Sequence, residues 1–301
     1  MTQASSPPAA PPASATLWSR VAPPLFVFLW STGFIGARLG TPYAEPFTFL
    51  AWRMTIATGL LLVFALATRA PWPATARGYL HASVAGLLVH GAYLGGVFSA
   101  VALKVPLGQV ALIAGLQPVL TALLARRLFG ETVSRIQWIG MLLGFIGVAM
   151  VVAAKTGDAV ASPAGLAFSV VALLGITAGT LYQKRFCGGL DLRSGGVVQF
   201  VATGVLFWAC AFALETRVVA WTGEFLFALG WLTLVLSLGA ITLLYVLIRQ
   251  GAAAKVASLF FLTPPVTAVM AFALFGESLT LFALGGLAVT AVGVALVVRG
   301  R

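Results

Sequence analysis

The sequence predicts an all-α membrane protein of ten transmembrane helices, arranged as two inverted five-helix repeats. Three observations predict this fold. Hydrophobic residues make up 60% of the chain and charged residues only 8%, whereas soluble domains contain about 25% charged residues. Ten apolar segments follow one another with short connections, and one half of the chain repeats the other. The mean hydropathy of +1.04 indicates that lipid is the surrounding solvent.

The repeat is clearest in the stretch QPVLTALLARRLFGE, residues 117–131, which returns as TPPVTAVMAFALFGE at residues 263–277. The shift between the copies is 146 residues, close to half of the 301-residue chain. It continues beyond this stretch, because the tripeptide Gly-Val-Ala at 147–149 meets the same tripeptide at 293–295. Two copies of one unit in an apolar chain are typical of transporters built from paired halves.

Hydropathy then defines the elements. Residues 1–20 are predicted to be a disordered N-terminal tail, because the first sixteen are mostly Ala, Pro and Ser and carry no charge. The first repeat is expected at residues 21–154 and the second at 163–301. Each predicted span is near the ~20 residues that a transmembrane helix needs. The spans are 23–40, 46–67, 78–101, 107–128, 135–154, 163–184, 194–214, 226–248, 254–275 and 280–298.

The distribution of Lys and Arg predicts the orientation, because cytoplasmic loops are enriched in these residues. With the N-terminus inside, the outer side carries only Lys104, Lys155 and Arg217. The inner side carries Arg20, Arg69, Arg77, Arg126, Arg127, Arg135, Lys184, Arg185, Arg193, Arg249, Lys255, Arg299 and Arg301. We therefore expect a multi-pass protein of the cell inner (cytoplasmic) membrane with both termini in the cytoplasm.

The odd number of spans in each half has a topological consequence. Five spans reverse the side of the membrane, so the second repeat must enter the bilayer in the opposite direction. Inverted repeats of this kind place their binding site at the repeat interface near mid-membrane. The net charge of +11 is interpreted as topology, and no nucleic-acid partner is expected, because the basic residues form no continuous patch.

Prolines mark the centre of two matching spans. Pro118 and the pair Pro264-Pro265 lie near mid-membrane, each directly after a polar residue, Gln117 or Thr263. A proline inside a helix leaves the carbonyl four residues earlier without a partner, and in lipid such a group needs protein or a wet cavity. One interpretation is a helix kink healed by packing. The other is that both kinks, with Gln117 and Thr263, border one central cavity and take part in gating.

His90 lies in the middle of an apolar, glycine-rich span, with Tyr93 on the same helical face. An ionisable side chain at that depth faces the interior by default. His90 is therefore a candidate for substrate binding or for carrying a coupling proton. The alternative is a neutral histidine hydrogen-bonded to another helix. The second repeat has Leu236-Ser237 here, so a role for His90 belongs to one half only.

Two arginines lie within the first two predicted spans. Arg53 is interpreted either as a clamp for a carboxylate or phosphate group or as a side chain that reaches the interface or pairs with Glu45. For Arg38, reaching the interface or pairing with Glu45 is favoured. Further candidates for the cavity wall lie in the first and sixth spans, where aromatic residues mix with small or polar ones. These candidates are Trp30, Thr32, Phe34 and Tyr182.

Glycines are given structural roles. The small-xxx-small spacing of Gly140, Gly144 and Gly147, and the looser glycine series at 285, 286 and 293, predict close helix packing. Gly130 and Gly276 each precede a Glu at the end of a span. There the Gly permits a tight C-terminal turn, and the charge of Glu131 or Glu277 suits the dipole of the following helix.

These features together resemble the EamA-type transporters of the drug/metabolite transporter superfamily. The resemblance rests on the proline of the fourth span, the Leu-Phe-Gly-Glu that follows it, and the glycine-rich fifth span, all present in both halves. The opening LWSTGFIGARLG and Arg53 in AWRMT are also similar to that family. The resemblance implies ten helices, alternating access, and a central cavity lined by spans 1, 3, 4, 6, 8 and 9. His90 departs from the family pattern, and we interpret it as a residue that bears on substrate choice, since members of the family carry many different metabolites.

The expected function is a secondary transporter that exports small metabolites, most simply amino acids or related compounds. The alternatives are a multidrug or other-metabolite carrier, an uptake permease of the same fold, and a non-transporting scaffold. No HExxH or GxxxxGK[ST] motif occurs, so neither an enzyme nor an ATP-driven pump is expected, and no cofactor or metal is implied. The expected partners are a small-molecule substrate and the lipid bilayer, while proton coupling and oligomeric state stay open.

Overall fold

The computed structural model describes residues 13–105, 110, 113–153, 162–251, 253–275 and 280–300. Apart from a one-residue bridge between Ala44 and Val219, helices are the only regular structure in these ranges. In chain order they are α1 (Ala13–Gly40), α2 (Pro46–Ala67), α3 (Ala76–Gly86), η1 (Leu87–Ala92), α4 (Tyr93–Ala102), α6 (Gln117–Phe129), α7 (Arg135–Ala153), α8 (Pro163–Phe186), α9 (Leu192–Leu214), α10 (Gly223–Trp231), η2 (Leu232–Ala240), α11 (Ile241–Gln250), α12 (Ala253–Ser258), η3 (Leu259–Leu262), α13 (Thr263–Phe275) and α14 (Leu281–Arg299).

Nine helical stretches in the described part of the chain are long and apolar enough to cross a membrane. They coincide with nine of the ten predicted spans. Of the remaining one, predicted at 107–128, the structure describes Val110 and residues from 113 onward, including α6. One boundary is wrong: α1 begins at Ala13, inside the tail predicted at 1–20. No proline interrupts residues 13–22, and the alanines and Leu17 there favour a helix.

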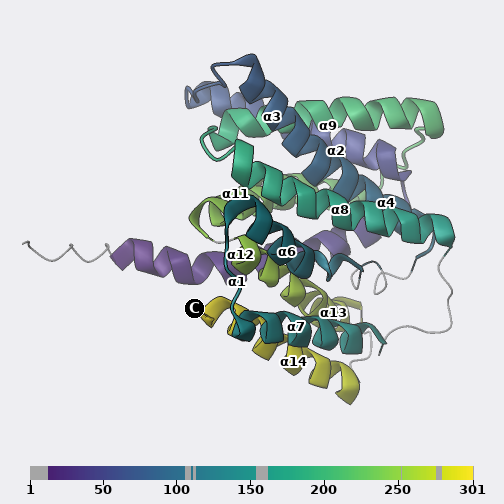
Figure 1. Ribbon diagram of the computed structural model, residues 1–301. Helices are drawn as coiled ribbons and strands as arrows, with labels where there is room; N and C mark the ends of the chain where they lie inside the picture. Colours follow the sequence, from purple (N-terminus) through teal and green to yellow (C-terminus); the bar gives the residue numbers. More distant parts are fainter. Residues whose placement is uncertain are drawn as a thin grey trace, which may run out of the picture.

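The 146-residue shift maps helices onto helices. It moves α6 onto α13 and α7 onto α14 with identical bounds, and α2 onto α9 with bounds that differ by one residue at one end. In space, α7 packs against α14 at one edge of the bundle and α2 packs against α9 at the other (Figure 1). The helices α7 and α14, and likewise α2 and α9, therefore pack on their own repeat mates.

Glycines bring α7 and α14 into backbone contact, as their spacing predicts. A Cβ added at Gly293 would lie 2.4 Å from the backbone nitrogen of Gly144 and 2.6 Å from the carbonyl oxygen of Gly140. A Cβ at Gly147 would lie 2.6 Å from the carbonyl oxygen of Gly286. These distances are shorter than van der Waals contact and involve backbone atoms that cannot rotate away. The absence of side chains is therefore required for this pair of helices to pack.

We expect Gly293→Ala to destabilise the protein, while Gly285→Ala on the same helix has little effect. The methyl group at 293 meets backbone, whereas at 285 its nearest neighbour is the Met150 methyl carbon at 3.6 Å, an ordinary contact. Overpacking of this kind costs about 1–3 kcal/mol. Thermal unfolding of the purified protein in detergent measures the difference. Equal unfolding temperatures for the two variants would contradict the tight α7–α14 contact.

Four helices are interrupted at matching positions. The third predicted span contains the π-helix η1, and its repeat mate contains the π-helix η2; the shift moves residues 87–92 to 233–238, inside η2. In the fourth span and its mate, α6 and α13 begin at Gln117 and Thr263, directly before the prolines. π-Helical turns are rare in proteins overall, and those that do occur are often found at functional sites. The breaks lie in the same part of both repeats.

The sequence suggested that the prolines lie inside continuous helices, but the structure shows that they do not. Pro118 is in the first turn of α6, after a turn at Gly115-Leu116, and Pro264 follows the 3₁₀-helix η3. Proline is favoured in the first turn, where its missing N–H is not needed. The carbonyl of Phe260, expected to lack a partner, accepts the N–H of Thr263 because the 3₁₀ turn tightens the chain. The kinks are thus helix restarts.

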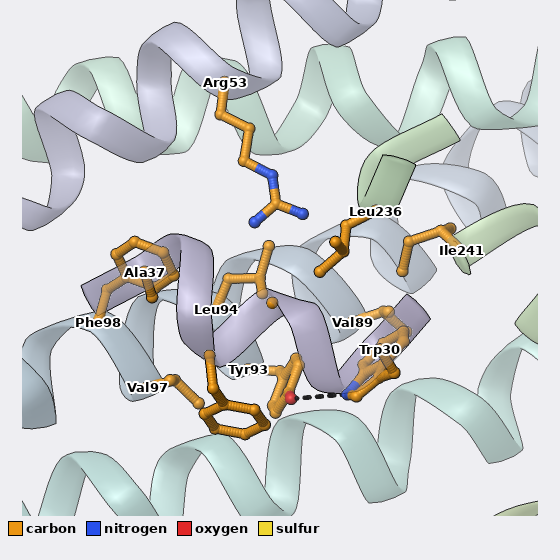
Figure 2. Close-up of a pocket in the computed structure, with 12 residues that line it drawn as sticks. Trp30, Ala37, Arg53, Val89, Tyr93, Leu94, Val97, Phe98, Leu236 and Ile241 are labelled. Carbon is orange, nitrogen blue, oxygen red and sulfur yellow. Dashed lines mark hydrogen bonds between the residues drawn. The ribbon is translucent and has the colours of Figure 1, made fainter. Parts of the chain in front are cut away.

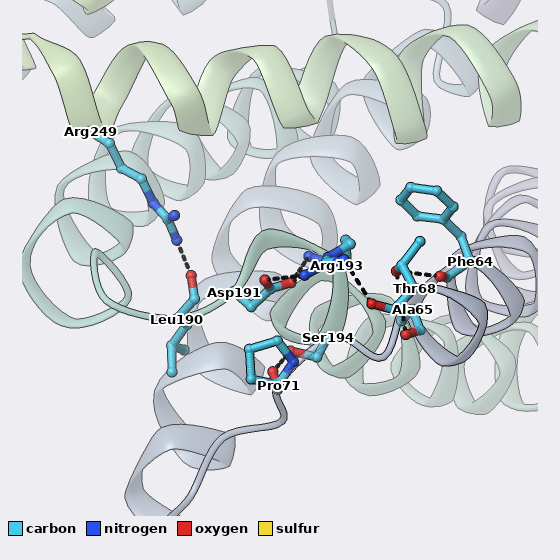
Figure 3. A network of polar contacts seen from close by, with 9 residues as sticks. All are labelled: Phe64, Ala65, Thr68, Pro71, Leu190, Asp191, Arg193, Ser194 and Arg249. Carbon is cyan, nitrogen blue, oxygen red and sulfur yellow. Dashed lines mark hydrogen bonds and ion pairs between the residues drawn. The ribbon is translucent and has the colours of Figure 1, made fainter.

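The bundle has two ends that differ in their polar contacts. At the end where α1 begins and α14 finishes, which we call the terminal face, the connections after α2, α6, α8 and α11 meet. Figure 3 shows part of it: Asp191 pairs with Arg193 at 2.8 Å, and Arg249 donates to the carbonyl of Leu190. The hydrogen bond from Arg193 lowers the pKa of Asp191. These contacts link the start of α9 to the end of α11.

A second contact on the terminal face bridges elements that are distant in sequence. Lys184 Nζ, at the end of α8, lies 2.7 Å from Glu131 Oε1 and donates at 2.9 Å to the carbonyl oxygen of Gly251. Glu131 Oε1 also accepts the N–H of Ala253, at 3.1 Å, at the start of α12. The charge of Glu131 therefore lies at α12 and not at the helix that follows it in sequence.

Gly130 has φ 66° and ends α6 in the left-handed conformation, as predicted. Gly276 and Glu277 lie outside the described residues.

At the opposite face, the connection between α1 and α2 is tied to the one between α9 and α10. Glu215 accepts the N–H groups of Phe47 and Thr48 at 2.7 and 2.6 Å. Glu45 accepts the hydroxyl and the N–H of Thr216, and these hydrogen bonds hold the pKa of Glu45 below its ordinary value. Arg38, for which Glu45 was one suggested partner, has an exposed side chain at the end of α1.

Candidate functional site

Three pockets lie in series between the helices of the bundle. The central pocket, about 20 Å³, is lined by Trp30, Phe34, Tyr93, Ala114, Gly115, Gln117, Ile176, Phe260, Thr263 and Pro264. It shares Trp30, Phe34 and Tyr93 with an upper pocket of about 40 Å³, and it shares Gln117 and Phe260 with a lower pocket of about 10 Å³. The upper pocket extends to Ala37 and Phe98, toward the opposite face, and the lower one extends to Ile248 and Ala253, near the terminal face.

The central pocket lies at the helix restarts. Gln117 begins α6 and Thr263 begins α13, and both line this pocket although 146 residues separate them. Gln117 is 1% exposed and Thr263 is 3% exposed. Within the described part of the chain, neither Gln117 Nε2 nor Thr263 Oγ1 has a hydrogen-bond partner. Buried polar atoms are normally paired, so two unpaired ones at one small cavity indicate a place for a polar ligand or water.

Aromatic side chains form the wall that the central and upper pockets share. The ring of Trp30 lies 5.9 Å from that of Tyr93 in a stacked arrangement and 5.1 Å from that of Phe260 in an edge-on arrangement. Trp30 Nε1 donates to the Tyr93 hydroxyl at 3.3 Å (Figure 2). Such rings favour flat apolar groups, while the Tyr93 hydroxyl adds a polar point between them.

Arg53 lies at the upper pocket. Its side chain is 2% exposed, and its Nε donates to Ser237 Oγ in η2 at 2.9 Å. Figure 2 shows the guanidinium directed from α2 toward the space between Leu94 and Leu236, with the Trp30–Tyr93 pair beyond. The described residues include no carboxylate in contact with this guanidinium. A positive charge is thus buried at an aromatic cavity.

Comparisons with known proteins show what this chain resembles. Residues 24–153 match the model of the EamA-like transporter family. The chain is 28% identical to YvbV of Bacillus subtilis (strain 168), an uncharacterized transporter, over 90% of this chain and 88% of that protein. It is 27% identical to YedA of Escherichia coli (strain K12), an uncharacterized inner membrane transporter, over 91% and 88% of the two chains.

Over residues 24–153 the chain is therefore similar to the EamA-like transporter family. A solved crystal structure with 22% sequence identity superposes with a TM-score of 0.76 over 95% of this chain and 96% of the other, which supports the same fold over the full bundle. Both relatives are named as uncharacterized transporters. The pockets of this protein are therefore considered as part of a transport path.

The resemblance implied a cavity lined by spans 1, 3, 4, 6, 8 and 9. The three pockets are lined from these elements, together with Arg53 from the second span. Of the residues that sequence reasoning proposed, six line a pocket: Trp30, Phe34, Arg53, Tyr93, Gln117 and Thr263. Pro264 lines the central pocket as well, while Pro118 and Pro265 lie beside it in the first turns of α6 and α13.

His90 does not line any of these three pockets. It is 1% exposed, its Nε2 lies 3.5 Å from the Tyr245 hydroxyl, and its ring packs against Phe200 at 4.8 Å. Tyr245 in turn donates to Gln199 Oε1 at 2.6 Å, and Gln199 Nε2 donates to Gln183 at 3.1 Å. This arrangement agrees with the alternative left open from the sequence, a histidine bonded to another helix.

Thr32 and Tyr182 also face away from the pockets. Thr32 Oγ1 donates to the carbonyl of Leu29 at 2.6 Å and accepts Trp231 Nε1 from α10 at 2.9 Å. The Tyr182 hydroxyl lies 2.7 Å from His81 Nδ1 of α3. Both side chains hold neighbouring helices together, because the faces of α1 and α8 that carry them point at α10 and α3.

Other pocket residues were missed. From α8 the wall is formed by Ile176 and Thr180, and from the second repeat by Leu236, Phe260 and Ile241. Most are aliphatic or aromatic and carry no chemical signal in an apolar chain. One signal was available for Phe260: it lies four residues before Pro264, where a break in the helix was expected.

Proposed function

We propose that this EamA-type protein is a secondary transporter that works by alternating access and exports small metabolites, most simply amino acids or related compounds. The observation that supports this most is the central pocket. There, two helix restarts from the two repeats contribute unpaired polar atoms, Gln117 Nε2 and Thr263 Oγ1, to one buried cavity. A substrate bound there would contact both repeats and would respond when one moves against the other.

The matched helix boundaries support an inverted relation between the repeats. With five spans in each repeat, the second copy runs through the membrane in the opposite direction. A pseudo-two-fold axis in the membrane plane then relates η1 to η2 and the start of α6 to the start of α13. Transporters of this architecture bind their substrates near such an axis at mid-membrane. Rocking of one repeat against the other would open the series of pockets first to one face and then to the other.

The excess of Lys and Arg at the terminal face supports a cytoplasmic location for that face. Export then requires entry from the terminal face through the lower pocket and release past the upper pocket. In this conformation the lower pocket is the smallest of the three, about 10 Å³, and Lys184 and Glu131 bridge the helices beside it. We infer that this conformation is closed at the cytoplasmic end.

We expect Gln117→Leu to reduce export at least tenfold, while His90→Asn leaves it nearly unchanged. Leucine removes the unpaired amide from the pocket, whereas asparagine keeps a polar group near Tyr245 in a network that lines no described pocket. The measurement is metabolite analysis of the medium from expressing cells, followed by flux in proteoliposomes, at matched membrane abundance. Equal loss in both variants would mean that the network of His90 is part of the transport mechanism. No flux by the wild type in either direction would reject the transporter proposal.

A further inference from the structure

We propose that the upper pocket is a carboxylate site: Arg53 binds the carboxylate of a substrate whose apolar body lies against Trp30, Phe34 and Tyr93. This inference rests on the proposed function and names the chemical class of its substrate. The shared chemistry is a carboxylate on an apolar, ring-sized body. It is present both in aromatic amino acids and in the corresponding acids without an amino group.

The first step is the charge of Arg53. A guanidinium cannot be neutralised by losing its proton in a protein, and an ionised side chain within a membrane is expensive unless it is paired. Arg53 Nε is used by Ser237, and the described residues offer no hydrogen-bond acceptor to the two terminal nitrogens. A guanidinium presents these nitrogens as a planar fork that matches a carboxylate. The Arg53 guanidinium is therefore a buried cation at a cavity, and its two terminal nitrogens have no acceptor among the described residues.

The second step is that the other polar groups at the pockets are hydrogen-bond donors. Gln117 Nε2 is a donor without an acceptor among the described residues. The Tyr93 hydroxyl accepts from Trp30, so its own proton is free to donate within the part of the chain that is described. None of the described residues that line the three pockets is an Asp or Glu. A path with donors and a guanidinium, and without a carboxylate, favours anions and disfavours lipophilic cations.

The third step is the apolar wall. Apart from Arg53, the upper pocket is lined by apolar and aromatic side chains and glycine, including Phe34, Val97 and Phe98. The upper cavity of about 40 Å³ exceeds the ~10–15 Å³ that one water needs. It has room for a head group beside Arg53, while the shared wall of Trp30 and Tyr93 continues into the central pocket and can flank an apolar body. A small inorganic anion would leave this wall unused.

A purely structural role for Arg53 is the rival explanation, because its bond to Ser237 ties α2 to η2. Two variants separate the explanations. Arg53→Gln removes the charge, and Ser237→Ala removes the tie while it keeps the charge. If Arg53 only ties the helices, both variants lower thermal stability alike and neither changes ligand preference selectively. If Arg53 binds a carboxylate, only Arg53→Gln abolishes the preference for carboxylates.

The experiment compares four probes with one common body: phenylalanine, 3-phenylpropanoate, 3-phenylpropanamide and phenethylamine. Binding to the purified full chain in detergent is measured as the shift in unfolding temperature and as Kd, and flux is measured in proteoliposomes. We expect binding of 3-phenylpropanoate, phenylalanine or both, and at least tenfold weaker binding of the amide and the amine. Arg53→Gln should weaken carboxylate binding at least tenfold, Ser237→Ala by less than threefold, and Arg53→Lys should retain part of it.

Each outcome decides one point. Binding of 3-phenylpropanoate alone means that the site takes acids without an ammonium group, and equal binding of phenylalanine means that the ammonium is tolerated. Carboxylate binding without flux would uphold the site and reject transport. Flux of some other metabolite, with no carboxylate binding, would uphold transport and reject the site. Equal affinity for acid, amide and amine, or unchanged affinity in Arg53→Gln, overturns the proposal.

Discussion

Replacing Glu131 by glutamine is expected to open the terminal face and to raise the rate of maleimide labelling at Cys187 about tenfold or more. Glu131 Oε1 is the shared acceptor for Lys184 Nζ at 2.7 Å and for the N–H of Ala253 at 3.1 Å. The carboxylate therefore holds the end of α8 to the start of α12. Without this charge, Lys184 keeps the carbonyl of Gly251, the ring of Phe129 and a neutral amide oxygen at position 131, but it loses its ion pair. The closed conformation therefore loses stability relative to the open one.

The magnitude follows from the burial of the pair. Breaking a fully buried ion pair costs about 3–5 kcal/mol, but Lys184 and Glu131 are 22% and 16% exposed, so solvent screens part of the loss. About 1.4 kcal/mol is a conservative value, and this corresponds to a tenfold change in the open population. Charge reversal of both partners, Glu131→Lys with Lys184→Glu, should slow labelling again only in part, because it restores the attraction between the two side chains but not the hydrogen bonds to the N–H of Ala253 and the carbonyl of Gly251.

Cys187 is a suitable reporter because the closed structure keeps it unreactive. It is fully buried three residues after Lys184, and burial raises the pKa of its thiol from 9.0 to about 11. Thiolates are the reactive form, so labelling through the open state should level off above pH 9, whereas labelling of the closed state would keep rising to about pH 11. The experiment uses a Cys210→Ala background, since Cys210 is the other free thiol.

The matched control is Arg185→Gln, which removes a positive charge from the exposed neighbour of Lys184 without touching the bridge. It should leave the labelling rate within a factor of two. If Glu131→Gln and Arg185→Gln label Cys187 equally, the Lys184–Glu131 pair does not close the terminal face, and the inferred state of this conformation is wrong.

The same pair shows why sequence reasoning reached only part of this structure. The spans were predictable because their length and hydropathy are fixed by the bilayer. The repeat drew attention to Gln117 and Thr263, but as residues beside helix kinks and not as the starts of new helices. The partner of Glu131 was not predictable. Its contact joins residues 131, 184 and 253, which are brought together only by the packing of α6, α8 and α12. From the sequence, its charge was assigned to the following helix, the nearest one along the chain.

Helix rotation set the other limit. Apolar side chains surround these helices on most sides, since lipid and protein interior are equally apolar, so hydropathy does not show which face of a helix meets the cavity. Trp30 and Tyr93 line the pockets, whereas Thr32 and Tyr182, on the same helices as pocket residues, face α10 and α3. Arg53 was detectable because charge within a span is rare, but its alternatives could be separated only by its burial and its position at a cavity.

Thr263→Val is expected to raise the stability of the protein without substrate while it lowers transport at least tenfold. Valine has nearly the shape of threonine, so the change removes one hydroxyl from a side chain that is 3% exposed. That hydroxyl has no partner in the described part of the chain, and an unpaired buried polar group costs about 1–3 kcal/mol. The unfolding temperature in detergent and the flux in proteoliposomes measure the two effects.

Opposite signs for stability and transport are what distinguish a binding group from a structural one. Thr203→Val on α9 is the matched control: its hydroxyl is fully buried but donates to the carbonyl of Gln199 at 2.9 Å, and Thr203 lines none of the three pockets. The control should lower the unfolding temperature slightly and leave flux unchanged. A loss of stability in Thr263→Val would show that the hydroxyl is satisfied within the protein. Unchanged flux in that variant would exclude Thr263 from the path, and the central pocket would then have to recognise its substrate through Gln117 and the aromatic wall alone.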